Sequence, residues 1–516
     1  MFFTMERSQS RAMCNDPADN PNRLPAILAR AGLCATLFTL AGCLVGPRYH
    51  QPEAVKDVQL PGSYKEAAVH YKNGIGWKEA QPADAMLRGD WWKVYHDPEL
   101  NALESELEIN NQNIRQSFQN FMASRAMVDE AVSQMYPTLT AEGSAIRSAA
   151  GVATPATAIM GSLSLSWEPD LWGRIRNQIR AAEYNAQVSA ADLENERLTE
   201  QTALAVYYFE IRGQDALEKL YQDTITADKA ALEYNENQFK TGITGEISVV
   251  QARNTLENAE AIATNVGVLR AQYEHAIATL VGKPATNFSM QVKVLDTEPP
   301  AIPIGVPSQL LERRPDIAAA ERSMAAANAQ IGVAYAAYFP TVTLGGSGEY
   351  KGTTFPNLFS QESRLWSVGP DVSETIIDGG LRNATVHQNV ATYNAALAGY
   401  RQTTLTGFQQ VEDYLAQVRI LSKQLIEQRA AVKSAQRALD LEMNRYRTGI
   451  DPYVDVVQAQ TTLLGDQQTA INVQVQEMTG SVQLIEALGG GWDRSLLPSA
   501  WQVSAPPTAE ETKIQN

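Results

Sequence analysis

Residues that could carry out chemistry are scattered in this sequence of 516 residues. It has no glycine-rich phosphate loop and no His-Glu-x-x-His motif, and the Gly-Ser-Gly at Gly346–Gly348 is too short for the sharp turn that exposes a catalytic serine. The carboxylates Glu168 and Glu374 are expected at strand ends and not as an acid–base pair. The histidines form no ligand pair four residues apart, the spacing that puts two metal ligands on one helix face; they are His50, His70, His96, His275 and His387. We therefore expect no enzyme, no cofactor and no metal site.

The overall charge and apolar content exclude two further classes. The formal charge of −16 argues against a nucleic-acid partner, because phosphate binding needs clustered lysine and arginine. The sequence has no run of about 20 apolar residues, so we expect no transmembrane helix. All three cysteines, Cys14, Cys34 and Cys43, lie near the start of the chain, which leaves no disulfide or thiolate metal site elsewhere.

Residues 1–42 read as a secretory signal peptide. Arg23 and Arg30 precede the short apolar stretch Ala31–Leu40, and small residues follow. Leu40-Ala41-Gly42-Cys43 resembles a bacterial lipobox, which implies that Cys43 becomes the lipidated first residue of the mature chain. The alternative is an ordinary signal peptide with an incidental cysteine, and Met13 is an alternative start. Leu44, where an aspartate would favour inner-membrane retention, favours the outer membrane.

Two similar turns indicate that the chain is duplicated. Thr241-Gly242-Ile243 recurs as Thr448-Gly449-Ile450, in each case after a long charged helical pattern and before an apolar run ending in Gln-Ala. Few glycines or prolines interrupt the preceding helices, which are predicted at about 70 and about 65 residues, so the first would be about 100 Å long at 1.5 Å per residue. Such a length is typical of coiled coils and helical repeats.

Each copy is predicted to contain a helix, a hairpin, a very long helix, a tight turn and a helix. Repeat 1 covers 98–286, with an amphipathic helix over 98–135, strands at about 138–147 and 161–169, and a turn at 241–245. Repeat 2 covers 315–491, with strands at about 341–350 and 365–375 and a turn at 448–452. The remaining segments are an extended N-terminal segment at 43–97, a proline-rich connector at 287–314 and a polar C-terminal tail at 492–516, expected to be disordered after Pro498.

The strands indicate an assembly of several chains. Their alternating pattern and length suit tilted strands that cross a bilayer. Four strands cannot close a barrel, and an open sheet edge cannot sit in lipid. Three chains would supply a 12-stranded barrel, inside the range of known outer-membrane pores, and a ring of helices wide enough for a water-filled lumen.

Several motifs resemble the outer membrane factor (TolC-like) family, and most closely its NodT-type efflux lipoprotein branch. They are the lipobox, Gly46-Pro47-Arg48-Tyr49 with Gln51-Pro52, Asp170-Leu171-Trp172-Gly173-Arg174, and Leu311-Glu312-Arg313-Arg314-Pro315-Asp316. The resemblance implies a mainly α, partly β homotrimer: a transmembrane β-barrel continuous with a long periplasmic α-helical barrel, plus an equatorial region. It also implies a passive conduit in the outer membrane that docks with a periplasmic adaptor and an inner-membrane transporter of the RND type.

The resemblance assigns roles to residues at the two turns. It places the lumen constriction just after the second turn, at Val454 and Gln458; related pumps often carry an acid at the second position, which is glutamine here. Arg445 and Tyr446 stand where the family's tethering contacts hold helix pairs closed, and Asp451 and Asp455 are the acids available for a ring. The adaptor is expected to contact both turns and their flanks: Lys240, Thr241, Gly242, Gly245, Glu246, Arg447, Thr448 and Gly449.

Two readings of function from different classes remain, an export conduit and a non-conducting surface coiled-coil lipoprotein. The amphipathic strands and the duplicated hairpin favour the conduit, because a stalk needs neither. Within the conduit reading, the exit duct of a type I secretion system is the alternative to drug efflux. Single-channel conductance in planar bilayers would separate a conduit from a stalk.

Overall fold

The computed structural model describes residues 44–54, 63–66, 89–149, 151, 154–295, 297–300, 302 and 312–506. Two compact units make up the chain. The strand unit comprises Pro137–Arg176 and Phe339–Thr375 together with Leu44 and Val45, and the helical unit holds the other described residues. The predicted signal peptide and lipidated Cys43 lie outside the described residues.

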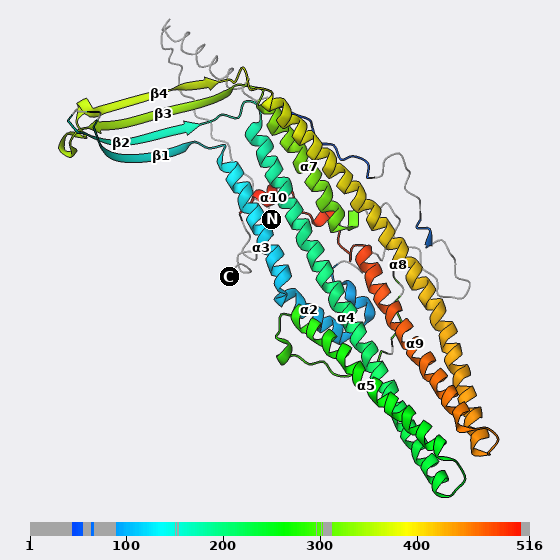
Figure 1. Ribbon diagram of the computed structural model, residues 1–516. Helices are drawn as coiled ribbons and strands as arrows, with labels where there is room; N and C mark the ends of the chain where they lie inside the picture. Colours follow the sequence, from blue (N-terminus) through cyan, green and yellow to red (C-terminus); the bar gives the residue numbers. More distant parts are fainter. Residues whose placement is uncertain are drawn as a thin grey trace, which may run out of the picture. The chain divides into compact units, whose positions relative to one another are not determined.

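The strand unit is a four-stranded antiparallel sheet in the order β1-β2-β3-β4. Its strands are β1 (Thr138–Ser148), β2 (Ala156–Trp167), β3 (Thr341–Gly352) and β4 (Arg364–Ser373) (Figure 1). Strand β2 begins earlier than the predicted residue 161, because Ala156 to Met160 continue the ladder opposite Ser148 to Ser144 of β1. Each repeat thus supplies one hairpin, and β2 pairs with β3 to join the two.

The helical unit repeats one order of elements. Its first copy contains α2 (Pro98–Asn110), α3 (Gln112–Ser133), α4 (Arg174–Lys240) and α5 (Glu246–Leu280), and its second copy contains α7 (Pro315–Ala336), α8 (Leu381–Arg447) and α9 (Tyr453–Ala487). Both α4 and α8 have 67 residues, which at 1.5 Å per residue makes each about 100 Å long. In Figure 1, α4 with α5 and α8 with α9 form two antiparallel pairs whose turns lie at the same end of the helical unit.

Short elements complete the described chain. They are the 3₁₀ helices η3 (Trp91–Tyr95), η4 (Ala285–Asn287), η5 (Phe355–Asn357), η6 (Gln361–Ser363) and η7 (Arg494–Leu496), and the helix α10 (Ala500–Ser504).

The single first helix predicted over 98–135 is wrong, because the chain breaks at Asn111. Asn111 has an extended backbone, and its side-chain oxygen accepts the N–H groups of Asn113 and Ile114 to cap α3. Its side-chain nitrogen donates to Glu200 of α4 and to the carbonyl of Leu280. The local bonds of the asparagine side chain compete with helical hydrogen bonding, and its bonds to Glu200 and Leu280 stabilise the break from outside the helix.

The C-terminal tail is also ordered further than predicted. Ser499 and Gln502 form a capping box that starts α10. Val503 is buried in a cluster with Phe121 and Val128 of α3, and the Arg125 guanidinium donates to the carbonyl of Val503. The expectation of disorder directly after Pro498 is therefore wrong for the residues up to 506.

The N-terminal segment packs against the helices of the helical unit. Asn328 of α7 donates to the carbonyl of Pro47 at 3.1 Å, and the Tyr49 hydroxyl donates to the buried Glu321. Further along, the backbone N–H groups of Lys65 and Glu66 donate to the carboxylate of Glu412 on α8. The Gly46–Tyr49 motif thus contributes to the helical core.

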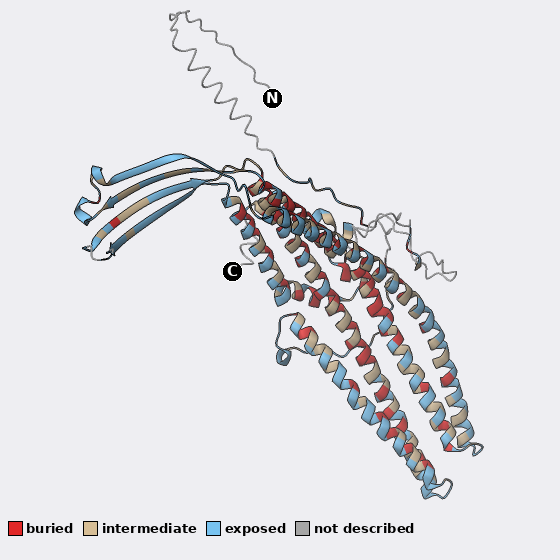
Figure 2. Cartoon of the chain, turned by 45° about the horizontal axis from the view of Figure 1, so that its top comes forward, coloured by how far each residue is buried: buried red, intermediate tan, exposed pale blue. Residues whose placement is uncertain are grey.

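The main core lies along the middle of the helices. Figure 2 shows buried residues concentrated there and exposed residues dominating the two turns. Large side chains such as Trp91, Leu100, Tyr208 and Ile277 are fully buried in one cluster. Among the described residues, no helix has an apolar stretch long enough to span a bilayer.

Candidate functional site at the helical turns

The two turns share one backbone geometry. The N–H groups of Gly242 and Gly449 donate to the carbonyls of Phe239 and Tyr446, each at 2.9 Å. The N–H of the following isoleucine donates to the carbonyl one residue earlier, that of Gln238 in the first turn and of Arg445 in the second, again at 2.9 Å. Both glycines have φ +74°. This is the Schellman motif, which ends a helix with a left-handed residue and suits glycine because it has no Cβ. The repeated Thr-Gly-Ile therefore has a structural cause.

The turns present exposed side chains around these glycines. Ile243 is 73% exposed and Ile450 is 67% exposed. Every residue predicted for adaptor contact is also exposed: Lys240, Thr241, Gly242, Gly245 and Glu246 at the first turn, and Arg447, Thr448 and Gly449 at the second. Each turn therefore presents one exposed isoleucine beside polar and charged residues.

Tyr446 connects the two helix pairs. Its hydroxyl donates to the side-chain oxygen of Asn235 on α4 at 2.6 Å, and its ring packs against Tyr453 with centroids 5.2 Å apart. Burial raises the pKa of Tyr446, while hydrogen bonds with Thr244 and Ser248 beside the first turn lower it. The hydroxyl of a second-repeat residue thus lies among polar groups of the first repeat, in an arrangement that we call the Tyr446 latch.

Arg445 closes its own turn. Its guanidinium pairs with Asp451 through two hydrogen bonds, one of them at 2.9 Å. The hydrogen bond from Arg445 lowers the pKa of Asp451, and the charge of the arginine adds to that effect. Because both partners belong to the second turn, this pair stabilises the turn and does not join the helix pairs within one chain.

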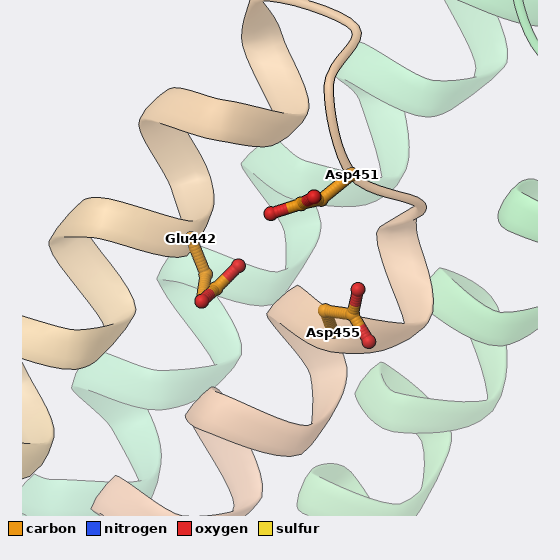
Figure 3. A group of neighbouring side chains, drawn as sticks. All are labelled: Glu442, Asp451 and Asp455. Carbon is orange, nitrogen blue, oxygen red and sulfur yellow. The ribbon is translucent and has the colours of Figure 1, made fainter.

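Three acids gather around this arginine. Glu442 of α8, Asp451 of the turn and Asp455 in the first turn of α9 have carboxylate oxygens within 4.8 Å of one another, and Figure 3 shows them on three consecutive elements. The charges of Glu442 and Asp455 contribute to raising the pKa of Arg445, after its contacts with Asp451. One arginine leaves a net negative group here, which favours nearby cations.

Val454 and Gln458 lie one helical turn apart on α9. Val454 is 46% exposed, and Gln458 is exposed. Neither residue belongs to the buried cluster that joins Ala252, Tyr453 and Val456 at this end of the helical unit. The second turn therefore brings together Arg445, Asp451 and Asp455, and it leaves Val454 and Gln458 on an exposed face.

Sequence reasoning missed Asn235, Asp228 and Glu442. Asn235 and Asp228 are buried on α4, at the same three-to-four spacing as the apolar Ile225 and Leu232. Polar residues at such positions in a coiled coil set register at a cost in stability. That interruption of the apolar pattern was visible in the sequence, but the partner Tyr446 lies 211 residues away from Asn235.

Comparison with known proteins identifies a family. The family model described as "Outer membrane efflux protein" matches residues 103–283 and 306–490, which is most of the two repeats. The match therefore covers both long helices and both turns.

Individual relatives match along nearly their full length. The chain is 31% identical over 467 residues to a toluene efflux pump outer membrane protein of Pseudomonas putida, TtgF, covering 89% of this chain and 96% of the relative. It is 27% identical over 475 residues to the cation efflux system protein CusC of Escherichia coli, covering 89% and 98%. The solved structure of the outer-membrane channel OprN is similar with a TM-score of 0.77 and 27% identity, covering 87% of this chain and 100% of that one.

Proposed function

The chain belongs to the outer membrane efflux protein family, and we propose that it is the outer-membrane exit channel of a tripartite efflux system. In this role it conducts cargo passively from an inner-membrane transporter of the RND type and a periplasmic adaptor to the outside. The observation that carries the proposal is the duplicated pair of 67-residue helices with exposed, geometrically equivalent turns, within a family of efflux channels.

We propose that three copies assemble. In one chain, β1 and β4 each leave a sheet edge with unpaired backbone groups. Exposed apolar residues such as Leu139, Leu165 and Val368 lie on strands of this sheet. Lipid does not tolerate an open edge, so joining β1 of one copy to β4 of the next would close a 12-stranded transmembrane barrel. The long helices of the three copies would then form the periplasmic α-helical barrel, with an equatorial region around it.

The membrane anchor follows from the N-terminus. The lipobox-like Leu40–Cys43 and the following Leu44 support a lipid on Cys43 and an outer-membrane location, as in the NodT-type branch. A lipid chain and a barrel are compatible, since the extended segment after Cys43 carries the chain to its contacts on the helical unit at Pro47 and Tyr49.

We assign gating to the second turn and docking to both turns. The Tyr446 latch joins the two helix pairs, so its rupture would let them separate. Arg445, Asp451 and Asp455 would place charge at the narrow end of the lumen, with Val454 and Gln458 on the exposed face of α9 next to them. The exposed turn residues from Lys240 to Glu246 and from Arg447 to Gly449 would contact the adaptor.

We assign cargo selection to the transporter. Relatives of similar identity are named for toluene and for cation efflux, so one scaffold serves unlike cargo. A wide passive conduit has no tight site that discriminates small molecules, which leaves that choice to its partners.

Planar bilayer recording tests the proposal. The purified full-length chain should give defined single-channel conductance steps, and cross-linking in detergent should yield a trimer. Absence of any defined step from a trimeric, correctly folded preparation would instead support a non-conducting surface lipoprotein. Export of a protein substrate in cells, with no change in small-molecule accumulation, would support a type I secretion duct.

A further inference from the structure

A cavity of about 420 Å³ lies among the four long helices of the helical unit. Residues from α4, α5, α8 and α9 line it, so both repeats contribute to its walls. Of the residues that line it, Asp228 is the one with an ionisable side chain. Asp228 is only 3% exposed, although it carries a carboxylate.

Two hydrogen-bond acceptors of this cavity lack donors. Within the described chain, the side-chain oxygen Oδ2 of Asp228 and the oxygen Oε1 of Gln460 are buried without a hydrogen-bond partner. A buried polar atom without a partner costs about 1–3 kcal/mol, so both atoms favour a molecule that brings N–H or O–H groups. A carboxylate without a cation adds the further requirement of positive charge.

The rest of the wall combines a larger apolar area with the polar, uncharged side chains of Thr224, Asn254, Thr255, Asn258, Thr461 and Gln467. It includes Ala227 of α4, Ala259 and Ile262 of α5, Leu439 of α8, and Val457 and Leu463 of α9. These side chains suit a hydrocarbon group. A divalent metal ion fits less well, because calcium takes about 6–8 oxygen ligands and magnesium demands an octahedral set.

We propose that this cavity binds the primary ammonium group of a small amphiphilic amine, with Asp228 and Gln460 accepting its N–H groups and the apolar residues enclosing its tail. A primary ammonium offers three N–H donors, enough for both orphaned acceptors. The inference does not rest on the proposed channel function, because the cavity exists within one chain.

Such a ligand would link the two helix pairs. Asp228 lies on α4 of the first pair and Gln460 on α9 of the second, and both line the cavity, so an ammonium group that donates to both would contact both pairs. The cavity lies next to the Tyr446 latch, since Tyr453 packs against Tyr446 and its pKa responds to the charge of Asp228. Binding should therefore stabilise the arrangement in which the pairs are joined.

The pH dependence has a defined direction. Burial raises the pKa of Asp228 to about 6. The titratable group that faces it from another helix is Tyr453, whose pKa is raised to about 12, chiefly by burial, and the cavity walls from α5 and α8 are uncharged. The ammonium needs the ionised aspartate, so affinity should rise about tenfold between pH 5 and pH 7.5 as Asp228 loses its proton.

Calorimetric titration of the full-length protein in a nonionic detergent with n-octylammonium tests the inference. At pH 7.5 we expect saturable binding that weakens at least about tenfold in Asp228→Asn, because a charge-assisted hydrogen bond is lost. Gln460→Leu should weaken it by a smaller factor. The matched control is Asp223→Asn on the same helix, where the aspartate is exposed and pairs with Lys219, and it should bind as the unsubstituted protein does.

A second control changes the ligand and keeps the protein the same. n-Octanol has the same tail without the charge and should bind at least about tenfold more weakly than n-octylammonium. A helical content and a thermal midpoint equal to those of the unsubstituted protein would show that Asp228→Asn folds. Three results would each overturn the inference. The first is equal affinity of Asp228→Asn and the unsubstituted protein for n-octylammonium, and the second is equal affinity of the unsubstituted protein for n-octanol and n-octylammonium. The third is a high-resolution map that shows only water in the cavity at a saturating concentration of the amine.

Discussion

Substitution of Tyr446 by phenylalanine isolates the contribution of one hydroxyl group to the proposed gate. The change removes only the hydroxyl that donates to Asn235 at 2.6 Å. The ring remains, and with it the contacts to Tyr234 and Tyr453. The phenylalanine variant therefore tests the bond between the helix pairs and leaves their packing in place.

The magnitude follows from the burial of the acceptor. Asn235 is 0% exposed, so its side-chain oxygen loses its donor without gaining water. Leaving such an acceptor unsatisfied costs about 1–3 kcal/mol. If water reaches Asn235 when the pairs separate, only the closed state of the variant is destabilised by the missing hydrogen bond. The ratio of open to closed channels should then rise about 5- to 150-fold for each latch that must break.

Single-channel recording in planar bilayers measures this ratio as the fraction of time spent open. Tyr234→Phe is the matched control, because the Tyr234 hydroxyl accepts from Gln238 on its own helix, at 2.8 Å, and does not join the two pairs. We expect the Tyr446→Phe channel to spend a larger fraction of time open than the unsubstituted channel. The Tyr234→Phe channel should have the same open fraction as the unsubstituted channel. Unit conductance should stay the same, because the pore wall is not changed.

A double-mutant cycle completes the test. Asn235→Ala removes the other partner of the hydrogen bond. Asn235→Ala should therefore change the open fraction less in the Tyr446→Phe channel than in the unsubstituted channel. Equal open fractions for Tyr446→Phe and Tyr234→Phe would refute the latch. So would fully additive effects of the two substitutions, since independent residues do not share a bond.

Three further predictions concern stability, each read as a thermal midpoint of the full-length protein. Burial raises the pKa of Glu104 well above its ordinary value, so ionisation of this carboxyl favours unfolding. The thermal midpoint of Glu104→Gln should therefore rise relative to that of the unsubstituted protein as the pH increases from 4 to 8. A difference between the two midpoints that does not change with pH would contradict this. Gly449→Ala should cost about 1–2 kcal/mol because of its φ of +74°, whereas Gly465→Ala, in open space within α9, should not destabilise. Val503→Ala should cost about 2 kcal/mol and speed proteolysis after residue 498, and unchanged cleavage would mean that α10 does not hold the tail.

The long helices and their turns were predictable because their causes are local. Long helical patterns without proline and with few glycines specify α4 and α8, and a glycine after each specifies the Schellman turn. The hairpins were predictable from alternation, although β2 begins earlier than expected because its first residues show little contrast between faces. Local chemistry of this kind needs no knowledge of distant partners.

The break at Asn111 and the ordered α10 were not predictable in the same way. Asn111 finds its partners 89 and 169 residues further along the chain, at Glu200 and Leu280. Arg125 donates to the carbonyl of Val503, 378 residues away. The amphipathic pattern of the first helix continues across the break, and the tail is polar by composition. Only contacts across the fold decide between the alternatives at these two places.

Three polar residues next to the proposed gate, Asp228, Asn235 and Gln460, break the apolar pattern between the two helix pairs. On α4, Asp228 and Asn235 take positions that apolar residues would fill at lower cost, and on α9 Gln460 follows Tyr453 and Val456 at the same spacing. A fully apolar seam would hold the helix pairs together without a directional contact. Polar groups in the seam are satisfied only by a specific partner, as Asn235 is by Tyr446, or remain open to a ligand, as Asp228 is. A seam that must separate benefits from such contacts, because water can replace a hydrogen bond on opening but offers no compensation for an exposed apolar side chain.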